Sequence, residues 1–194
     1  SLINSINRMK YNAKILKNSK DIHKYNKIIL PGVGSFERAS TILKKKNFYF
    51  EIKNYIKKKN NHILGICLGM QILLNDSEEK IDKSQKNIGL GLIDGKVKKF
   101  SHKKKISNIG WSDIKINSKK NVLFESLANN ISPLYFVHQY FCKVTENRIV
   151  TSMSKFDKIN FCSSFQKKNI FGVQFHPEKS SKFGELILKN FLDL

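Results

Sequence analysis

The sequence predicts an α/β fold in which a mostly parallel central sheet is flanked by helices and carries added antiparallel strands. In the first half, the apolar runs 27–30 and 62–66 each end in a glycine-containing turn that leads into a helical pattern. Alternating strands and helices are typical of a parallel sheet covered by helices. In the second half, short β-prone segments follow one another closely, which indicates antiparallel hairpins. No linker or repeat interrupts this order, so we expect one domain over residues 1–194.

The chain begins with apolar residues at helical spacing over 2–9, followed by a predicted strand over 13–16. In a parallel α/β fold a helix in this position should follow a strand, and none precedes it here. We therefore expect that a first strand, with its loop roughly ten to fifteen residues long, is missing from the N-terminus.

The later elements follow the same patterns. A helix is expected over residues 36–57, broken near Asn47, and another after Cys67. A closing helix is expected over 182–194, because its apolar residues fall on one face. The strands predicted for the second half are 96–100, 113–116, 134–138, 140–144, 148–152, 161–166 and 169–175.

The chain is strongly basic, with a formal net charge of +21, which invites a nucleic-acid-binding hypothesis. We disfavour it because arginine, the residue preferred for base and phosphate recognition, supplies only 3 of the 36 basic residues. The remainder are lysines, and their clusters at 44–46, 57–59 and 103–105 are interpreted as solvated faces.

Other classes are disfavoured by composition. No apolar run reaches membrane-spanning length and no signal-peptide pattern opens the chain, so no membrane association and a cytoplasmic location are expected. Three cysteines without paired spacing predict neither a disulfide framework nor a zinc site. We expect no metal and no cofactor.

The segment Gly65-Ile66-Cys67-Leu68-Gly69 places a cysteine between two glycines at a strand-to-helix turn. Such a turn projects a nucleophile from the sheet, and the glycines leave room for its strained backbone. The start of the following helix and a nearby imidazole would both favour the thiolate. Taken alone, the pattern is also typical of a buried cysteine in a tight turn.

A second segment, residues 171–178, is a predicted buried strand that ends at His176, with Pro177 and Glu178 after it. The carboxyl ends of parallel strands share one edge of the sheet, so His176 and Cys67 are expected to meet there. The imidazole can take the thiol proton, and the carboxylate can fix its tautomer. A surface histidine beside a helix-capping glutamate is the local alternative.

These segments resemble the class I (triad) glutamine amidotransferases, which have a flavodoxin-like fold, and are most similar to the glutaminase subunits of imidazole glycerol phosphate synthases. The resemblance rests on 31–36, 65–71, 110–111, 135–138 and 171–180. It implies that Cys67, His176 and Glu178 form a catalytic triad that hydrolyses glutamine. It further implies an oxyanion hole at Val33, Gly34 and Leu68, and substrate contacts at Gly32, Gln71, Gln139 and Tyr140. Gln139 departs from the family, which usually has Ser or Thr there.

The resemblance also implies a partner, a (β/α)8-barrel cyclase that receives the ammonia in a heterodimer. Trp111, Tyr135, His138 and Lys179 would lie near the docking surface. For Trp111 the alternative is a core aromatic residue, for His138 a structural histidine at a strand end, and for Lys179 a solvated side chain.

Two other functions stay open at this point. A paralogous subunit could supply ammonia for surface-polysaccharide sugar modification, since Asp94 and the segment 182–184 are similar to those paralogues. A non-catalytic binding module with the same fold would result if the three triad side chains were misaligned.

Overall fold

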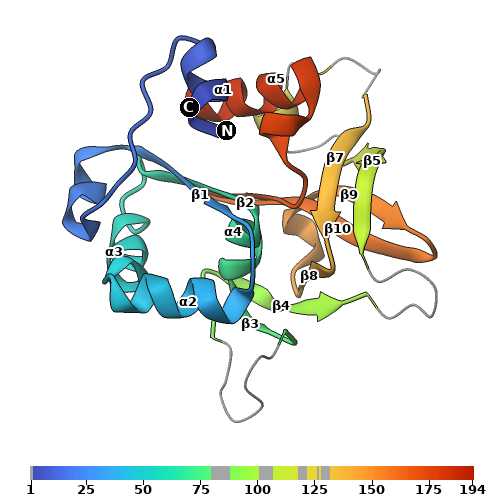
Figure 1. Ribbon diagram of the computed structural model, residues 1–194, viewed down its shortest axis with the longest axis horizontal. Helices are drawn as coiled ribbons and strands as arrows, with labels where there is room; N and C mark the ends of the chain where they lie inside the picture. The colour runs from blue at the N-terminus through green and yellow to red at the C-terminus, as the bar shows by residue number, and fades with distance from the viewer. Residues whose placement is uncertain (1, 80–87, 101–106, 118–121, 126, 128–131) are drawn as a thin grey trace.

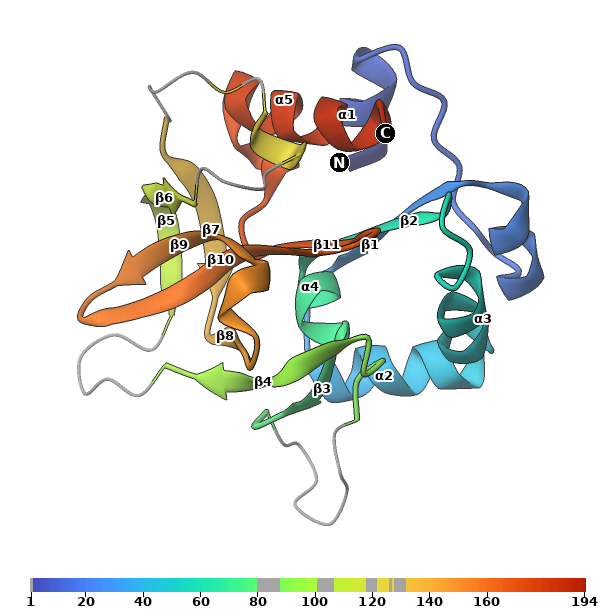
Figure 2. The same ribbon diagram turned by 180° about the vertical axis from the view of Figure 1, so that it is seen from behind.

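The protein is described by a computed structural model that covers residues 2–79, 88–100, 107–117, 122–125, 127 and 132–194. Within these ranges a mixed sheet of nine strands has the order β1-β2-β11-β10-β8-β4-β3, extended by β9 and β6. Figures 1 and 2 show this sheet from opposite sides. Parallel pairing joins β1 (Lys27–Gly32), β2 (His62–Cys67) and β11 (Ile170–Val173), with β2 in the middle. The three strands therefore end at the same edge of the sheet.

The antiparallel part continues from β11, as the hairpin pattern predicted. It contains β10 (Ile159–Lys167), β8 (Tyr140–Val144) and β4 (Ile93–Lys99), while β9 (Val150–Phe156) and β6 (Ile114–Ile116) extend it to one side. At its far end β3 (Leu74–Ser77) pairs parallel with β4. A separate two-stranded sheet joins β5 (Asn108–Ser112) and β7 (Leu134–His138). The sequence patterns did not predict β3 and β5.

Helices cover both faces of the parallel strands (Figures 1 and 2). On one face lie α2 (Phe36–Lys45), α3 (Phe48–Tyr55) and α4 (Leu68–Ile72), and on the other α1 (Leu2–Arg8) and α5 (Ser181–Leu192). Alternation along β2 supplies both cores, because Ile63 packs in the cluster with α2 and α3 and Leu64 in the cluster with α5. Short 3-10 helices are η1 (Ser19–Lys24), η2 (Val122–Phe124), η3 (Asn147–Ile149) and η4 (Pro177–Lys179).

The predicted break near Asn47 is confirmed, since Asn47 adopts a left-handed φ of 61° between α2 and α3. The predicted strand over 13–16 is wrong, because these residues form no ladder. A cavity of about 490 Å³ lies between them and β1, so that neither backbone reaches the other for hydrogen bonding.

The lysine clusters at 44–46 and 57–59 are exposed, as interpreted from the sequence, while 103–105 lies outside the described residues. In the described part of the chain, no helix combines the length and the apolar character needed to cross a membrane.

Candidate active site

Cys67 ends β2 and precedes α4 with a φ of 53° and a ψ of −108°, a backbone conformation that residues other than glycine rarely adopt. The flanking glycines make this turn possible. A Cβ on Gly65 would lie 2.7 Å from the Gly69 backbone, and one on Gly69 would lie 1.7 Å from the Leu30 carbonyl oxygen. The close approach of α4 to β1 therefore requires Gly69, and the strained turn places the sulfur at the carboxyl edge of the sheet.

His176 follows β11 at this same edge and is held on several sides. Its backbone N–H donates to the carbonyl of Tyr135 at 2.8 Å, and its own carbonyl accepts from Ser180 Oγ at 2.6 Å. Its Nδ1 lies 2.9 Å from Glu178 Oε1. The other ring nitrogen, Nε2, is buried and makes no hydrogen bond of regular geometry within the described part of the chain.

The pKa of His176 reflects two opposing causes. Burial lowers the pKa, but interactions with the Cys67 side chain and with Glu178 outweigh it and raise the pKa to about 9. Burial raises the pKa of Glu178, yet hydrogen bonding to His176 brings it below its ordinary value. The arrangement therefore stabilises the imidazolium that forms when His176 takes the Cys67 proton, with the ionised Glu178 carboxylate beside it.

The sulfur of Cys67 has two further polar neighbours. The thiol lies 3.9 Å from the carbonyl oxygen of Val137, and Gln174 Nε2 lies 3.7 Å from the sulfur. Gln174 also accepts a hydrogen bond from Gln71 at 3.2 Å. Sequence reasoning assigned Gln174 no role; the available signal was a glutamine between two apolar residues of a predicted buried strand.

The Gly-rich loop after β1 lies against the cysteine turn. Gly32 is the register partner of Cys67, and a Cβ on Gly32 would lie 3.0 Å from Leu68 Cβ. Val33 is 80% exposed, whereas Gly34 has a φ of 106°, and a Cβ added to it would meet nothing within 4 Å. The predicted oxyanion residues thus lie on two segments that meet beside the sulfur.

The family profile for class-I glutamine amidotransferases matches residues 1–194. The chain belongs to this family. It is 44% identical over 168 residues to the imidazole glycerol phosphate synthase subunit HisH of Chlorobium luteolum, which covers 86% of this chain and 80% of the relative. It is 42% identical to HisH of Buchnera aphidicola over 98% of this chain and 91% of the relative. These identities place it in the HisH branch of the amidotransferases.

A solved glutamine amidotransferase superposes with a TM-score of 0.71, covering 98% of this chain and 89% of its own at 12% identity. That likeness confirms the predicted fold. The predicted class of cysteine-dependent glutamine amidotransferase, and the predicted subfamily, are confirmed by the family profile and by the HisH relatives.

On this amidotransferase, an exposed aromatic cluster lies next to the site; we define it as Ile109, Trp111, Tyr135 and Lys179. Trp111 is 53% exposed and Ile109 66% exposed, so Trp111 is not a core residue. The Trp111 and Tyr135 rings meet edge-on at 5.8 Å, and Lys179 Nζ lies 5.6 Å from the Tyr135 ring centroid. Val137 links the cluster to the site. It is the register partner of Ile109, and the Val137 carbonyl faces the Cys67 sulfur.

His138 was predicted near the docking surface, but its side chain is held in the interior and is not itself exposed for docking. Its side chain is 7% exposed, with Nδ1 2.8 Å from the Tyr140 carbonyl and Nε2 3.2 Å from Asn108 Nδ2. Burial lowers the pKa of His138 to about 4, so the ring is neutral. His138 is therefore a structural histidine beneath the surface strand, the alternative considered from the sequence.

The remaining predicted substrate residues lie around the Tyr140 carbonyl. Gln71 Nε2 donates to this carbonyl at 2.8 Å, and the adjacent Gln139 is exposed. Among the described residues, no group of three histidine, cysteine or acidic side chains is arranged to hold a metal ion.

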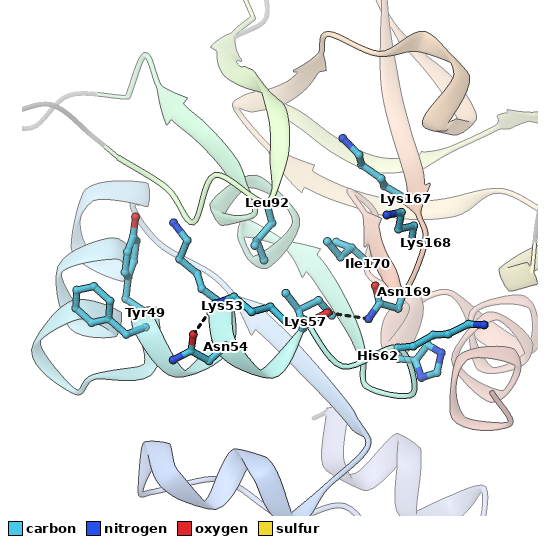
Figure 3. Close-up of a pocket in the computed structure, with 13 residues that line it drawn as sticks. Tyr49, Lys53, Asn54, Lys57, His62, Leu92, Lys167, Lys168, Asn169 and Ile170 are labelled. Carbon is cyan, nitrogen blue, oxygen red and sulfur yellow. Dashed lines mark hydrogen bonds between the residues drawn. The ribbon is translucent and has the colours of Figure 1, made fainter.

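A cleft of about 1170 Å³ lies at the opposite edge of the sheet, beside His62 at the start of β2 (Figure 3). Its apolar floor is formed by Ile56, Leu92 and Ile170, and Asn169 in its wall donates to the Ile56 carbonyl at 3.1 Å. The lysines that line it are Lys53, Lys57, Lys59, Lys167 and Lys168. The cleft contains none of the predicted site residues, so it is separate from the candidate active site.

Proposed function

We propose that Cys67, His176 and Glu178 hydrolyse the side-chain amide of glutamine. The observation that carries the proposal is the oriented imidazole: Glu178 occupies Nδ1, and Nε2 has no hydrogen-bond partner among the described residues and lies beside the Cys67 side chain. An imidazole held in this way can accept the thiol proton at Nε2.

The reaction would then proceed in two stages. The Cys67 thiolate attacks the amide carbon of glutamine, and the C–N bond breaks as His176 gives its proton to the departing ammonia. Water, deprotonated by His176, next attacks the glutamyl thioester, and the released thiolate takes that proton back. The products are glutamate and ammonia.

The oxyanion of each tetrahedral intermediate needs hydrogen-bond donors. We assign one to the N–H of Leu68 and a second to the loop of Val33 and Gly34. Gly34 has a φ of 106° and carries no Cβ, so the loop peptide can reorient with little steric cost. We infer that the second donor turns into place when the partner binds its ligand, so that the isolated chain has weak glutaminase activity.

Substrate glutamine would be held by Gly32, Gln71, Gln139 and Tyr140. Gln71 is the best supported of these, because its amide is fixed at the site edge by the Tyr140 carbonyl. Gln139 is exposed beside it and can contact the substrate through its backbone or its side chain.

We propose that the ammonia passes to a (β/α)8-barrel cyclase in a heterodimeric imidazole glycerol phosphate synthase, in the pathway of histidine biosynthesis. The HisH relatives are subunits of that synthase, which supports this acceptor over a surface-polysaccharide enzyme. The exposed aromatic cluster beside the site supports docking at this face. We further propose a cytoplasmic location, which fractionation of producing cells would test.

The test is ammonia release from glutamine with and without the barrel subunit. Cys67→Ala should abolish release, a loss of roughly a thousandfold or more. Cys162→Ser is the matched control, because Cys162 is buried on β10 with its sulfur 3.3 Å from the Ser164 carbonyl, an acceptor that a serine hydroxyl can also reach. Full ammonia release by Cys67→Ala would refute the proposal, and failure of the wild type to alkylate with a glutamine analogue would support a non-catalytic module.

A further inference from the structure

Gln174 is a buried polar residue that the catalytic scheme above does not use. It follows β11 directly, is 0% exposed, and has the core residues Val173 and Phe175 on either side. Burying a carboxamide costs free energy unless its N–H and carbonyl groups are hydrogen-bonded. Both ends of this one contact the candidate active site: Nε2 lies 3.7 Å from the Cys67 sulfur, and Oε1 accepts from Gln71 at 3.2 Å.

We propose that Gln174 is a positioning residue of the glutaminase site, which donates a hydrogen bond to the Cys67 sulfur and fixes the carboxamide of Gln71. The inference rests on the proposed function and extends it, because it assigns one buried side chain to both the nucleophile and a substrate contact.

The contact to sulfur gains strength when the thiol ionises. The neutral thiol can donate to the Val137 carbonyl, 3.9 Å away. Once the proton has moved to His176, the sulfur can only accept hydrogen bonds, and the Val137 oxygen no longer stabilises it. The N–H of Gln174 then donates to an anion, and such charge-assisted bonds are roughly twice as strong as neutral ones. Gln174 therefore favours the thiolate over the thiol.

The contact to Gln71 fixes the direction of a second carboxamide. The two hydrogens of Gln71 Nε2 are directed to the Tyr140 carbonyl at 2.8 Å and to Gln174 Oε1 at 3.2 Å. The oxygen of Gln71 diverges from its nitrogen and so points away from both acceptors. Loss of Gln174 would leave one N–H of Gln71 without an acceptor and free its amide to rotate.

Two substitutions separate these effects. Gln174→Glu keeps a carboxyl oxygen as the acceptor for Gln71 but replaces the N–H beside the sulfur with a negatively charged oxygen. Gln174→Met keeps the length of the side chain and removes both hydrogen bonds. The matched control is Gln166→Met on the neighbouring strand β10. In the described structure, the one hydrogen bond of the Gln166 side chain is to the Lys168 carbonyl, at 3.5 Å.

The first readout is the rate of Cys67 alkylation by iodoacetamide as a function of pH, measured on the labelled peptide by mass spectrometry. Burial raises the pKa of Cys142 and of Cys162, so these thiols should react slowly. We expect the midpoint of the Cys67 profile to move up by about one pH unit in Gln174→Met and by more in Gln174→Glu. Gln166→Met should not move it.

The second readout is glutamine hydrolysis with the barrel subunit. The KM for glutamine should rise roughly tenfold in Gln174→Met, which loses the Gln71 contact, and stay near the wild-type value in Gln174→Glu. Should Gln174→Met fail to fold, the alkylation profile and KM of Gln174→Glu decide.

Unchanged alkylation midpoints in folded Gln174→Met and Gln174→Glu would overturn the proposal. Equal changes in KM for these two variants would also overturn it. If the Gln174 variants show the expected shifts in Cys67 alkylation but the wild type releases no ammonia, the proposed function fails while the contact to sulfur stands.

Discussion

Nδ1 of His176 lies 2.9 Å from Oε1 of Glu178, while Nε2 of the same ring is buried without a hydrogen-bond partner in the described structure. The carboxylate therefore fixes which nitrogen carries the proton in the neutral ring, and leaves the other to exchange a proton with the thiol. The same contact links the stability of the protein to pH.

Glu178→Gln should lower stability in a pH-dependent way. The pKa of His176 is raised from 6.5 to about 9, so its contribution is complete below pH 6.5 and is lost as the pH rises through about 9. The pKa of Glu178 is lowered from 4.5, so its contribution is present above pH 4.5 and is lost as the pH falls. The difference in unfolding free energy between wild type and variant should therefore be largest between pH 4.5 and pH 6.5. Urea unfolding across this range measures it, and a pH-independent difference would contradict the assigned ion pair.

The pH dependence of stability that comes from His138 should be opposite to that from His176. Burial lowers its pKa from 6.5 to about 4, so the unfolded chain takes up a proton over an interval in which the folded protein does not. Wild-type stability should therefore fall as the pH drops from 6.5 to about 4, by up to about 1.4 kcal/mol per pH unit. His138→Gln removes this titration, so its unfolding free energy should decline less steeply. Parallel declines in the two proteins would show that His138 titrates normally.

The two glycines that flank the site from different segments should differ in their tolerance of alanine. Gly69→Ala places a Cβ 1.7 Å from the Leu30 carbonyl and should cost about 3 kcal/mol or more of unfolding free energy. Gly34→Ala meets nothing within 4 Å and strains only a φ of 106°, which should cost about 1 to 2 kcal/mol. Denaturant titration of both variants measures the contrast, and equal losses would contradict the close approach of α4 to β1.

Trp111→Ala should weaken partner binding and leave the isolated chain intact. The indole is 53% exposed, so the change in unfolding free energy should stay within about 0.5 kcal/mol. Binding of the barrel subunit, followed as stimulated glutamine hydrolysis, should weaken roughly tenfold or more.

Phe50→Ala is the matched control for that experiment. Phe50 is an aromatic residue 60% exposed, and it lines the lysine-rich cleft at the opposite edge of the sheet. The Phe50→Ala variant should bind the partner as tightly as the wild type does. Equal weakening by both variants would place the docking surface elsewhere.

Much of the fold could be predicted because its signals are local. The break at Asn47, the final helix and the strands 134–138 and 140–144 follow from periodicity and turn residues in their own segments. The strand over 13–16 was wrong for a non-local reason: a strand requires a partner edge, and a cavity separates these residues from β1. The strand β5 was missed for the same reason, because its pairing with β7 cannot be predicted from the local pattern of its own residues.

The sequence by itself determined the candidate nucleophile, base and carboxylate, because a strained turn between glycines and a histidine at a strand end have recognisable local patterns. Only the tertiary structure decided that Gln174 reaches both Cys67 and Gln71, that His138 is buried and neutral, and that Trp111 is exposed. The physical reason is that hydrogen bonding and burial depend on which segments the sheet brings together, and that pairing depends on contacts between residues far apart along the chain.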